Sequence, residues 1–411
     1  GAMIRRAVHR QMVADVPVGA FLSGGLDSSA VVAVAREKAP DIQCFTIDAA
    51  GGPENGTPDD LPYAKRVAEH LNVPLDVVRV DPDEMVRDLE MMVAQLEEPL
   101  ADPACLNVLY ISRLAREAGI KVLLSGSGGD DLFTGYRRHR AVRYDGYLSA
   151  IPKGLRSQLG RLAPVLNQSG SFQRRLAKFL TGIGLSGDDR LISYFLWTGR
   201  TDVLRLFSAE ARASLSDGGF TRQMERYLQG MPPESSDMDR ILALEQRFFL
   251  AEHNLIYTDK MSMAVGMEVR VPFLDLELVD FATTVPHGIK QKGSVGKWVF
   301  KKAMEPYLPN DVIYRPKAGF GSPLRRWLRG PLQVLMQDLL SMETLSRRGL
   351  FDPIEVQKLI EDDRTGRRDA SYTILSLMCM ELWCRNLLDA ARPGLQHERD
   401  PAVPLPLGPS A

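Results

Sequence analysis

The sequence predicts an α/β fold, in which a parallel sheet carries helices on both faces and a mostly helical C-terminal half follows. The first observation is that short apolar runs alternate with segments of helical spacing up to about residue 140, a pattern typical of βαβ units. The second is that strand signals fade beyond that point while helical spacing continues. The third is the composition, with 45% hydrophobic and 25% charged residues among 411, which is ordinary for a globular protein.

Local patterns place the elements of the N-terminal part in order. The first helix puts Ile4, Val8 and Met12 on one face, and the third is amphipathic and closes at Asn72. The first predicted strand reads as a buried one. The strands are expected at residues 16–22, 42–48, 74–80 and 120–126, and the helices at residues 4–14, 28–39, 60–72, 84–97 and 106–118.

The later part of the chain reads as helices packed against the sheet and closing one side of a cleft. Helical spacing is clear in LISYFLWTG and in ALEQRFFLAEHNLIYTDKMSMAV. We therefore expect one domain over residues 4–392, with an α/β part up to about residue 140 and a helical part from 141 onward. The proline-rich tail at 393–411 lacks apolar periodicity, and we expect it to be disordered.

Charge and residue counts exclude several classes of function. With 51 basic and 52 acidic residues the net charge is −1, so neither nucleic acid nor a membrane surface is an expected partner. No apolar run approaches the ~20 residues of a membrane span, and no signal peptide is visible, so we expect a cytoplasmic protein. The six histidines show no zinc-binding spacing. Four cysteines without a CxxC pair are expected to be buried and reduced; they are Cys44, Cys105, Cys379 and Cys384.

A glycine- and serine-rich turn joins the first predicted strand to the next helix. Its sequence is Ser23-Gly24-Gly25-Leu26-Asp27-Ser28. Glycines let the backbone approach a ligand closely, and a helix N-terminus with serine hydroxyls attracts an anion such as phosphate. The spacing and the lysine of a Walker P-loop are absent. Asp27 suits such a site only if it holds a cation, and Mg²⁺ bridging carboxylate and phosphate would resolve the conflict. The alternative is an ordinary strand–helix turn with Asp27 as a cap.

A second turn of the same character follows the fourth predicted strand. It reads Ser125-Gly126-Ser127-Gly128-Gly129-Asp130-Asp131. In a parallel sheet ligands bind beyond the carboxyl ends of the strands, so both turns should face one crevice. Asp130 could then complete a magnesium site begun by Asp27, whereas the alternative is a solvent loop with a capping aspartate.

Four ordered stretches resemble the asparagine synthetase family, whose synthetase part is an N-type ATP pyrophosphatase. DVPVGAFLSGGLDSS resembles its pyrophosphate loop, and VLLSGSGGDDLFTGYRRH resembles its SGxGxDE-LFxGY segment. DKMSMAVGMEVRVPFLD (259–275) and GKWVFKKAMEPYLPNDVIYRPKAGFGSP (296–323) resemble two later segments. The resemblance covers roughly residues 4–390. Enzymes that thiolate tRNA and synthetases of the NAD or GMP type share the first loop but lack the RVPFLD and RxKxGF segments.

The resemblance implies an enzyme that uses ATP and Mg²⁺ to convert a carboxylate into an acyl-adenylate, which a nitrogen nucleophile then attacks to give an amide. It implies that Lys297 stabilises charge at the α-phosphate, in keeping with the charge that develops there. Arg270, in the RVPFLD segment, is expected to be structural and to pair with an acid such as Glu268 or Asp275, and the alternative is a direct catalytic role. The implied phosphate ligands are Ser23, Gly24, Gly25, Asp27 and Ser28, the implied magnesium ligands are Asp27 and Asp130, and the implied adenine contacts, mainly through the backbone, are Leu22, Ile47 and Gly126.

The sequence departs from the family in two ways that concern its substrates. The family's N-terminal glutaminase domain, with its nucleophilic cysteine, is missing from this chain. We therefore expect ammonia or another amine from solution, from a partner or from a domain that has been removed, and a homodimer remains open.

The second departure lies at Ser127, where the family usually has an acid facing the acceptor substrate. An acid there could steer ammonium and take its proton, whereas serine cannot at neutral pH. Asp131, which we expect beside the reaction, replaces a more usual glutamate, and Asn107 stands near a common proline. The acceptor is therefore left open between aspartate and another acid, such as a sugar uronic acid or a natural-product carboxylate. A degenerate, non-catalytic ATP-binding module is the competing class.

Overall fold

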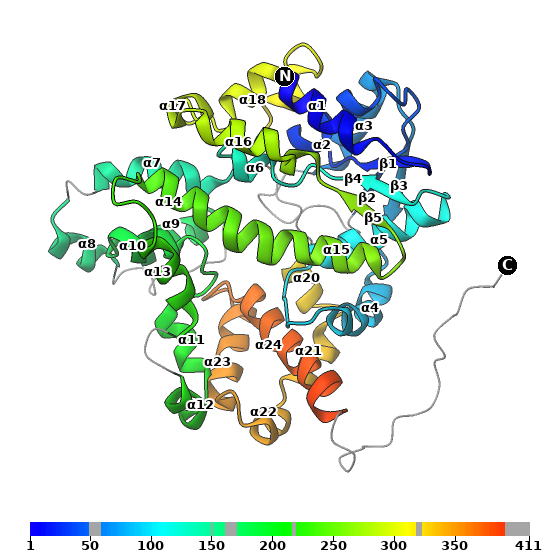
Figure 1. Cartoon of the computed structure of the whole chain (residues 1–411). Coiled ribbons are helices and arrows are strands. Elements are labelled where there is room, and N and C mark those ends of the chain that lie inside the picture. Colours follow the sequence, from blue (N-terminus) through cyan, green and yellow to red (C-terminus); the bar gives the residue numbers. More distant parts are fainter. Residues whose placement is uncertain (49–58, 149–150, 161–170, 216–218, 318–322, 391–411) are drawn as a thin grey trace.

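The computed structural model describes residues 1–48, 59–148, 151–160, 171–215, 219–317 and 323–390. The predicted disorder of residues 393–411 lies outside this part of the chain. Figure 1 shows the sheet and its helices as one lobe and the helices α20–α24 as another, with a long helix running between them. None of the described helices is both long and apolar enough to cross a membrane.

The sheet has five parallel strands in the order β3-β2-β1-β4-β5. The central strand pairs Ala20 with Cys44 on one side and with Leu124 on the other. This confirms the predicted fold class and the four predicted strands. The strands are β1 (Val18–Phe21), β2 (Cys44–Asp48), β3 (Leu75–Arg79), β4 (Val122–Leu124) and β5 (Glu268–Arg270).

The fifth strand is a feature that the sequence did not predict. β5 has three residues, two of them charged, and pairs Leu124 of β4 with Arg270. β4 is equally short but lies in an apolar run, whereas the two charged residues of β5 give no such signal. The partner of β5 is also far away in sequence, so only the fold brings the two together.

Alternating strand residues bury two faces of the sheet against different helices. Ala20 and Leu124 belong to a core formed with α1, α2 and α3, whereas Phe45 and Leu123 pack with α5 on the other face. The helices that flank the sheet early in the chain are α1 (Ala2–Gln11), α2 (Leu26–Ala35), α3 (Leu61–Leu71), α4 (Pro82–Gln95), α5 (Ala104–Glu117) and α6 (Gly129–Leu132). Asn72 closes α3 in the left-handed region, with φ +49°, as predicted.

The later helices build a second large core around α24. That core also receives side chains from α4 and α5, so it continues under the sheet. The helices from α7 onward, some of which pack into the other cores, are α7 (Arg137–Leu148), α8 (Lys153–Gly160), α9 (Ser171–Ile183), α10 (Gly187–Ser193), α11 (Arg200–Leu206), α12 (Ala209–Ser214), α13 (Arg222–Gln229), α14 (Asp237–Leu244), α15 (Leu255–Met263), α16 (Leu276–Thr284), α17 (His287–Lys290), α18 (Trp298–Met304), α19 (Asn310–Ile313), α20 (Leu324–Leu328), α21 (Gln333–Leu339), α22 (Met342–Arg348), α23 (Pro353–Arg364) and α24 (Ser371–Trp383).

A π-helical segment, η3 (Glu245–Asn254), joins α14 to α15 and makes them one long helix. Figure 1 shows this helix in green across the middle of the molecule. A second π-helix, η5 (Cys384–Asp389), follows α24, and two 3₁₀ turns are η2 (Gly219–Thr221) and η4 (Pro272–Leu274). π-helices are rare and are frequently found at functional sites.

The four cysteines are all buried and none forms a disulfide, which confirms the expectation for them. Burial raises the pKa of the Cys44 and Cys379 thiols to about 12. They therefore act as small apolar residues in the two large cores.

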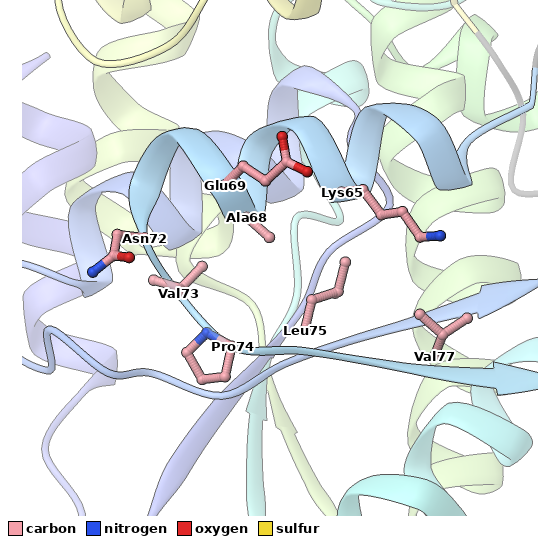
Figure 2. A pocket seen from close by; sticks show the side chains of 8 residues that line it. All are labelled: Lys65, Ala68, Glu69, Asn72, Val73, Pro74, Leu75 and Val77. Atoms are coloured by element: carbon pink, nitrogen blue, oxygen red, sulfur yellow. The ribbon is translucent and has the colours of Figure 1, made fainter.

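One cavity of about 500 Å³ lies between α3 and β3 (Figure 2). It is lined by Lys65, Ala68, Glu69, Asn72, Val73, Pro74, Leu75 and Val77. These residues come from α3, from the connection that follows it and from β3. The glycine-rich turns follow the opposite, carboxyl ends of β1 and β4, so this cavity is separate from the candidate site.

Candidate active site

The first glycine-rich turn is built as a tight strand–helix junction. Gly24 has φ +66°, and a side chain there would collide with the backbone of α3, because its Cβ would lie 2.3 Å from the Ala64 nitrogen. The Ser23 amide donates to Ser28 Oγ at 3.2 Å, and Ser28 Oγ donates to the Gly25 carbonyl at 3.3 Å. These bonds fold the serine hydroxyls over the first turn of α2. The helix begins two residues earlier than predicted, so Asp27 stands in its first turn.

The second turn packs directly on the first, as predicted. A Cβ on Gly126 would lie 2.5 Å from the Ser28 amide nitrogen. A Cβ on Gly129 would lie 2.5 Å from Asp27 Oδ1. Both glycines are therefore required by the close approach of the two turns, and this approach places Asp27 beside Asp130.

Lys297 joins the two aspartates although it lies 270 residues from Asp27. Its Nζ donates to Asp27 Oδ1 at 2.6 Å and Oδ2 at 2.5 Å, and it forms an ion pair with Asp130. The side chain is 7% exposed. Lys297 takes a left-handed conformation, φ +56°, and its amide donates to the Phe133 carbonyl at 3.0 Å. The backbone thus fixes the ammonium group between the two turns.

Sequence reasoning missed a second lysine at this site. Lys317 forms an ion pair with the other oxygen of Asp130. It stands in the RPKAGF stretch that carried part of the family resemblance, but no role was inferred for it. We call Asp27, Asp130, Lys297 and Lys317 the charged cluster, in which two carboxylates balance two ammonium groups.

The charged cluster sets the pKa values of its members. Burial raises the pKa of Asp27 above its ordinary value, against the opposing effect of Lys297. Burial acts in the same direction on Asp130, but Lys297 and Lys317 outweigh it and hold the Asp130 pKa below its ordinary value. Burial lowers the pKa of Lys297, yet the two carboxylates outweigh burial and raise it. Asp130 and Lys297 are therefore charged at neutral pH.

Asp131 and Ser127 lie in the same turn but outside these ion pairs. Asp131 is 1% exposed, and burial, followed by the charges of Glu245 and Asp130, raises its pKa well above the ordinary value. Its Oδ1 makes no hydrogen bond within the described chain. Ser127 Oγ lies 2.9 Å from Ser125 Oγ, and the Ser127 amide donates to that same hydroxyl.

The two aspartates suit a magnesium ion. Mg²⁺ prefers oxygen ligands and is usually bound by one or two carboxylates together with substrate phosphates. Asp27 and Asp130 converge on one ammonium group, which shows that both can reach a single cation. Among the described residues there is no group of three acidic, histidine or cysteine side chains that could bind a metal without help from a substrate.

The positions expected to contact adenine lie at the carboxyl ends of β1, β2 and β4. Leu22 is fully buried in the core, so only its backbone can meet a ligand, and its amide already donates to the Phe45 carbonyl at 2.9 Å. Ile47 is half-buried in β2, and Gly126 packs on the first turn of α2. An adenine site at these positions stays a prediction.

Arg315 is another residue that sequence reasoning missed. Its side chain is 6% exposed, forms an ion pair with Asp60 and lies 4.4 Å from the Tyr63 ring centre. Its Nη1 is buried without a hydrogen-bond partner among the described residues. Tyr63 is also the residue that packs against Gly24, so Arg315 supports the first turn from behind.

Arg270 has the structural role that was expected of it. Its Nε donates to Glu268 at 2.7 Å, and Nη1 donates to the carbonyls of Gln11 and Val13. Asp275, the other acid considered for Arg270, binds Arg10 instead. Arg270 thus ties β5 to the end of α1.

Comparison with known proteins places this arrangement in a family. A family model described as asparagine synthase matches residues 2–385. The chain is 28% identical to a glutamine-hydrolysing asparagine synthetase of Bacillus subtilis, over 92% of this chain and 57% of that protein. It is 30% identical to a putative glutamine-hydrolysing asparagine synthetase of Mycobacterium bovis, over 93% of this chain and 56% of that protein. An amidase of Penicillium rubens, chyE, is 23% identical over 86% of this chain. The chain thus spans little more than half the length of these relatives.

Proposed function

Because the chain belongs to the asparagine synthase family, we propose that it is an ATP-dependent amide synthetase that adenylates a carboxylate and transfers nitrogen to it. The charged cluster is the observation that carries this proposal. It places two carboxylates, one buried ammonium group and one exposed ammonium group against a phosphate-type turn at the carboxyl ends of parallel strands.

In the first step the acceptor's carboxylate oxygen attacks the α-phosphorus of ATP. The bond from the α-phosphorus to the bridging oxygen breaks, and pyrophosphate leaves. The amides and hydroxyls of Ser23, Gly25 and Ser28 bind the leaving phosphates at the start of α2. Lys297 donates to the α-phosphate oxygens, where negative charge grows in the transition state.

Asp27 and Asp130 would hold Mg²⁺. That ion neutralises phosphate charge when it is bound. Lys317 contacts the other oxygen of Asp130, and we propose that it donates to the acyl-phosphate oxygens. Because both lysines are already held by carboxylates, little reorganisation is needed when the nucleotide replaces those contacts.

In the second step the nitrogen attacks the acyl carbon, the carbon–oxygen bond to AMP breaks, and a proton leaves the nitrogen. We propose that ammonia is the nucleophile and that a glutaminase domain or partner supplies it. The support is that the relatives are named glutamine-hydrolysing while this chain spans about 57% of one of them. In the described structure Ser127 is paired with Ser125, so this position offers no carboxylate to take the proton.

Exchange of labelled pyrophosphate into ATP tests the first step directly. Adenylation is reversible, so an acid that the enzyme activates supports exchange of pyrophosphate into ATP. We expect at least one acid in a panel of carboxylic acids to do so. Lys297→Ala should abolish exchange while ATP binding stays within about tenfold, since the lysine acts mainly on the transition state. Lys301→Ala is a matched control in the following helix.

Two results would contradict the proposal. If ATP binds but no acid supports exchange, the chain is a non-catalytic ATP-binding module. If Lys297→Ala keeps most of the exchange rate, the charged cluster does not act on the α-phosphate.

An acceptor other than aspartate is the second candidate, and Ser127 is the observation that favours it. Residue 127 is serine where the family usually has an acid that faces the acceptor, so a uronic acid or a natural-product carboxylate is the alternative acceptor. The same exchange assay, run with aspartate and with glucuronate, separates these two acceptors.

A further inference from the structure

Four side chains along the long central helix form one continuous face toward the charged cluster. They are Glu245, Phe249, His253 and Tyr257, spaced four residues apart through η3 and into α15. Side chains at this spacing lie on one face of a helix. Phe249 stacks on His253 with ring centres 5.0 Å apart, and His253 meets Tyr257 edge-on at 5.4 Å.

This face begins at the charged cluster. Tyr136, which follows the second turn, meets Phe249 edge-on with ring centres 5.7 Å apart. The Lys317 ammonium lies 5.2 Å from the Tyr136 ring centre. We call Tyr136 and the three rings of the helix, Phe249, His253 and Tyr257, the aromatic face. Glu245 is not part of it. It runs without a break from the lysine that contacts Asp130 to the start of α5.

The first rings of the aromatic face are held in place from behind. The Arg138 guanidinium lies 4.4 Å from the ring centres of both Tyr136 and Phe249. It also forms an ion pair with Glu245, which is fully buried and contacts His139 as well. The charge of Arg138 is thereby neutralised, and the two rings are fixed before a ligand arrives.

The four side chains of the aromatic face are all half-buried, so each keeps some surface for a ligand. Polar groups occur at the far end, where His253 Nε2 lies 3.4 Å from Asp102 Oδ2. Burial raises the pKa of Tyr257 well above its ordinary value, and the neighbouring Asp102, Cys105 and Asp131 raise it further. The Asp102 carboxyl group at this end would disfavour a second carboxylate, such as the one aspartate carries.

From this arrangement we propose that the acceptor is a monocarboxylic acid with a planar, aromatic body that packs on the aromatic face. The proposal rests on the proposed function. The single carboxylate of such an acid would point toward Lys317 and Lys297. Because His253 and Arg138 cover the two faces of the Phe249 ring, the ligand ring would meet the edges of Phe249 and His253. A polar substituent would reach His253 and Asp102. Offset and edge-on ring contacts favour this class over a sugar acid or a short aliphatic acid.

The decisive measurement is pyrophosphate exchange with benzoate, cinnamate, aspartate and glucuronate. We expect at least one ring acid to support exchange at a rate at least about tenfold above aspartate and glucuronate. A faster rate with aspartate or glucuronate overturns this inference and leaves the proposed function intact. The absence of exchange with every acid, while ATP binds, overturns both.

Variants in the central helix give a readout that does not depend on turnover. Calorimetric titration with the better ring acid should show at least about tenfold weaker binding to Phe249→Leu, which removes the ring but keeps an apolar side chain. Phe248→Leu is the matched control, because Phe248 lies on the same helix but packs with Tyr227 in another cluster. Equal loss of affinity in both variants, or no loss in Phe249→Leu, would contradict the proposal.

Discussion

At the residue scale, Asp27 and Asp130 differ from Asp131 in what they contact, although all three are buried carboxyl groups. The first two meet lysines, whereas Asp131 meets other acids. The difference in surroundings explains why the pKa of Asp130 is lowered and that of Asp131 is raised. Adjacent residues of one type can thus serve as a charged ligand and as a neutral neighbour.

Removing the charge of either cluster aspartate should weaken magnesium binding. Asp27→Asn and Asp130→Asn are each expected to raise the Mg²⁺ concentration needed for half-maximal pyrophosphate exchange by about tenfold or more, because each removes one anionic ligand. A titration of exchange rate against Mg²⁺ measures this. Asp131→Asn makes the same change outside the ion pairs and should leave the magnesium requirement unaltered. If all three variants share the wild-type requirement, neither cluster aspartate is a ligand.

At the scale of elements, the sequence predicted those parts of the fold that have a regular local pattern. The first four strands were predicted because each lies within a longer, mainly apolar run, and the helices between them because helical spacing repeats over ten or more residues. β5 was missed because two of its three residues are charged and no apolar run marks it. The π-helix η3 was also missed, since its hydrogen bonding is not encoded in the spacing of apolar residues.

The candidate site was predictable only where its residues sit in a recognisable stretch. Asp27, Asp130 and Lys297 could be named from motifs, and the structure brings them together. Lys317 and Arg315 stand in such a stretch as well, but their contacts with Asp130 and Asp60 depend on how α3 and α6 approach that segment. Such contacts follow from tertiary packing and leave no local signal.

The segment that follows α6 has a glycine that the site depends on. A Cβ on Gly135 would lie 1.7 Å from Asp130 Oδ1 and 2.2 Å from Lys297 Cε. Gly135→Ala should therefore push the lysine and the carboxylate apart and lower the exchange rate at least about a hundredfold, given the sensitivity of catalysis to misplacement. Gly288→Ala in α17 is the control, because a Cβ there meets nothing within 4 Å. Thermal unfolding of both variants shows whether the fold survives, and wild-type exchange in Gly135→Ala would contradict the assigned geometry.

At the scale of the whole molecule, the two large cores are joined through the sheet. Cys44 lies in the core on the α2 side, and Cys379 lies in the core around α24. Phe21 and Ile47 of the sheet pack against the second core, so the strands separate the cores and are shared by both. We therefore expect the described α/β and helical parts to unfold together.

Thiol labelling can test this coupling, because each core holds its own cysteine. With a pKa of about 12 and no exposed surface, the Cys44 and Cys379 thiols should react with iodoacetamide at pH 8 at least about a thousandfold more slowly than a free thiol. In increasing urea both should become reactive at the same midpoint, because unfolding either core exposes a face of the shared sheet. Mass spectrometry of the labelled peptides follows the two sites separately in one sample. Two distinct midpoints would show that one part opens while the other persists, which would contradict the expected coupling. The charged cluster draws on segments far apart in the sequence, so we would then expect it to be lost at the lower urea midpoint.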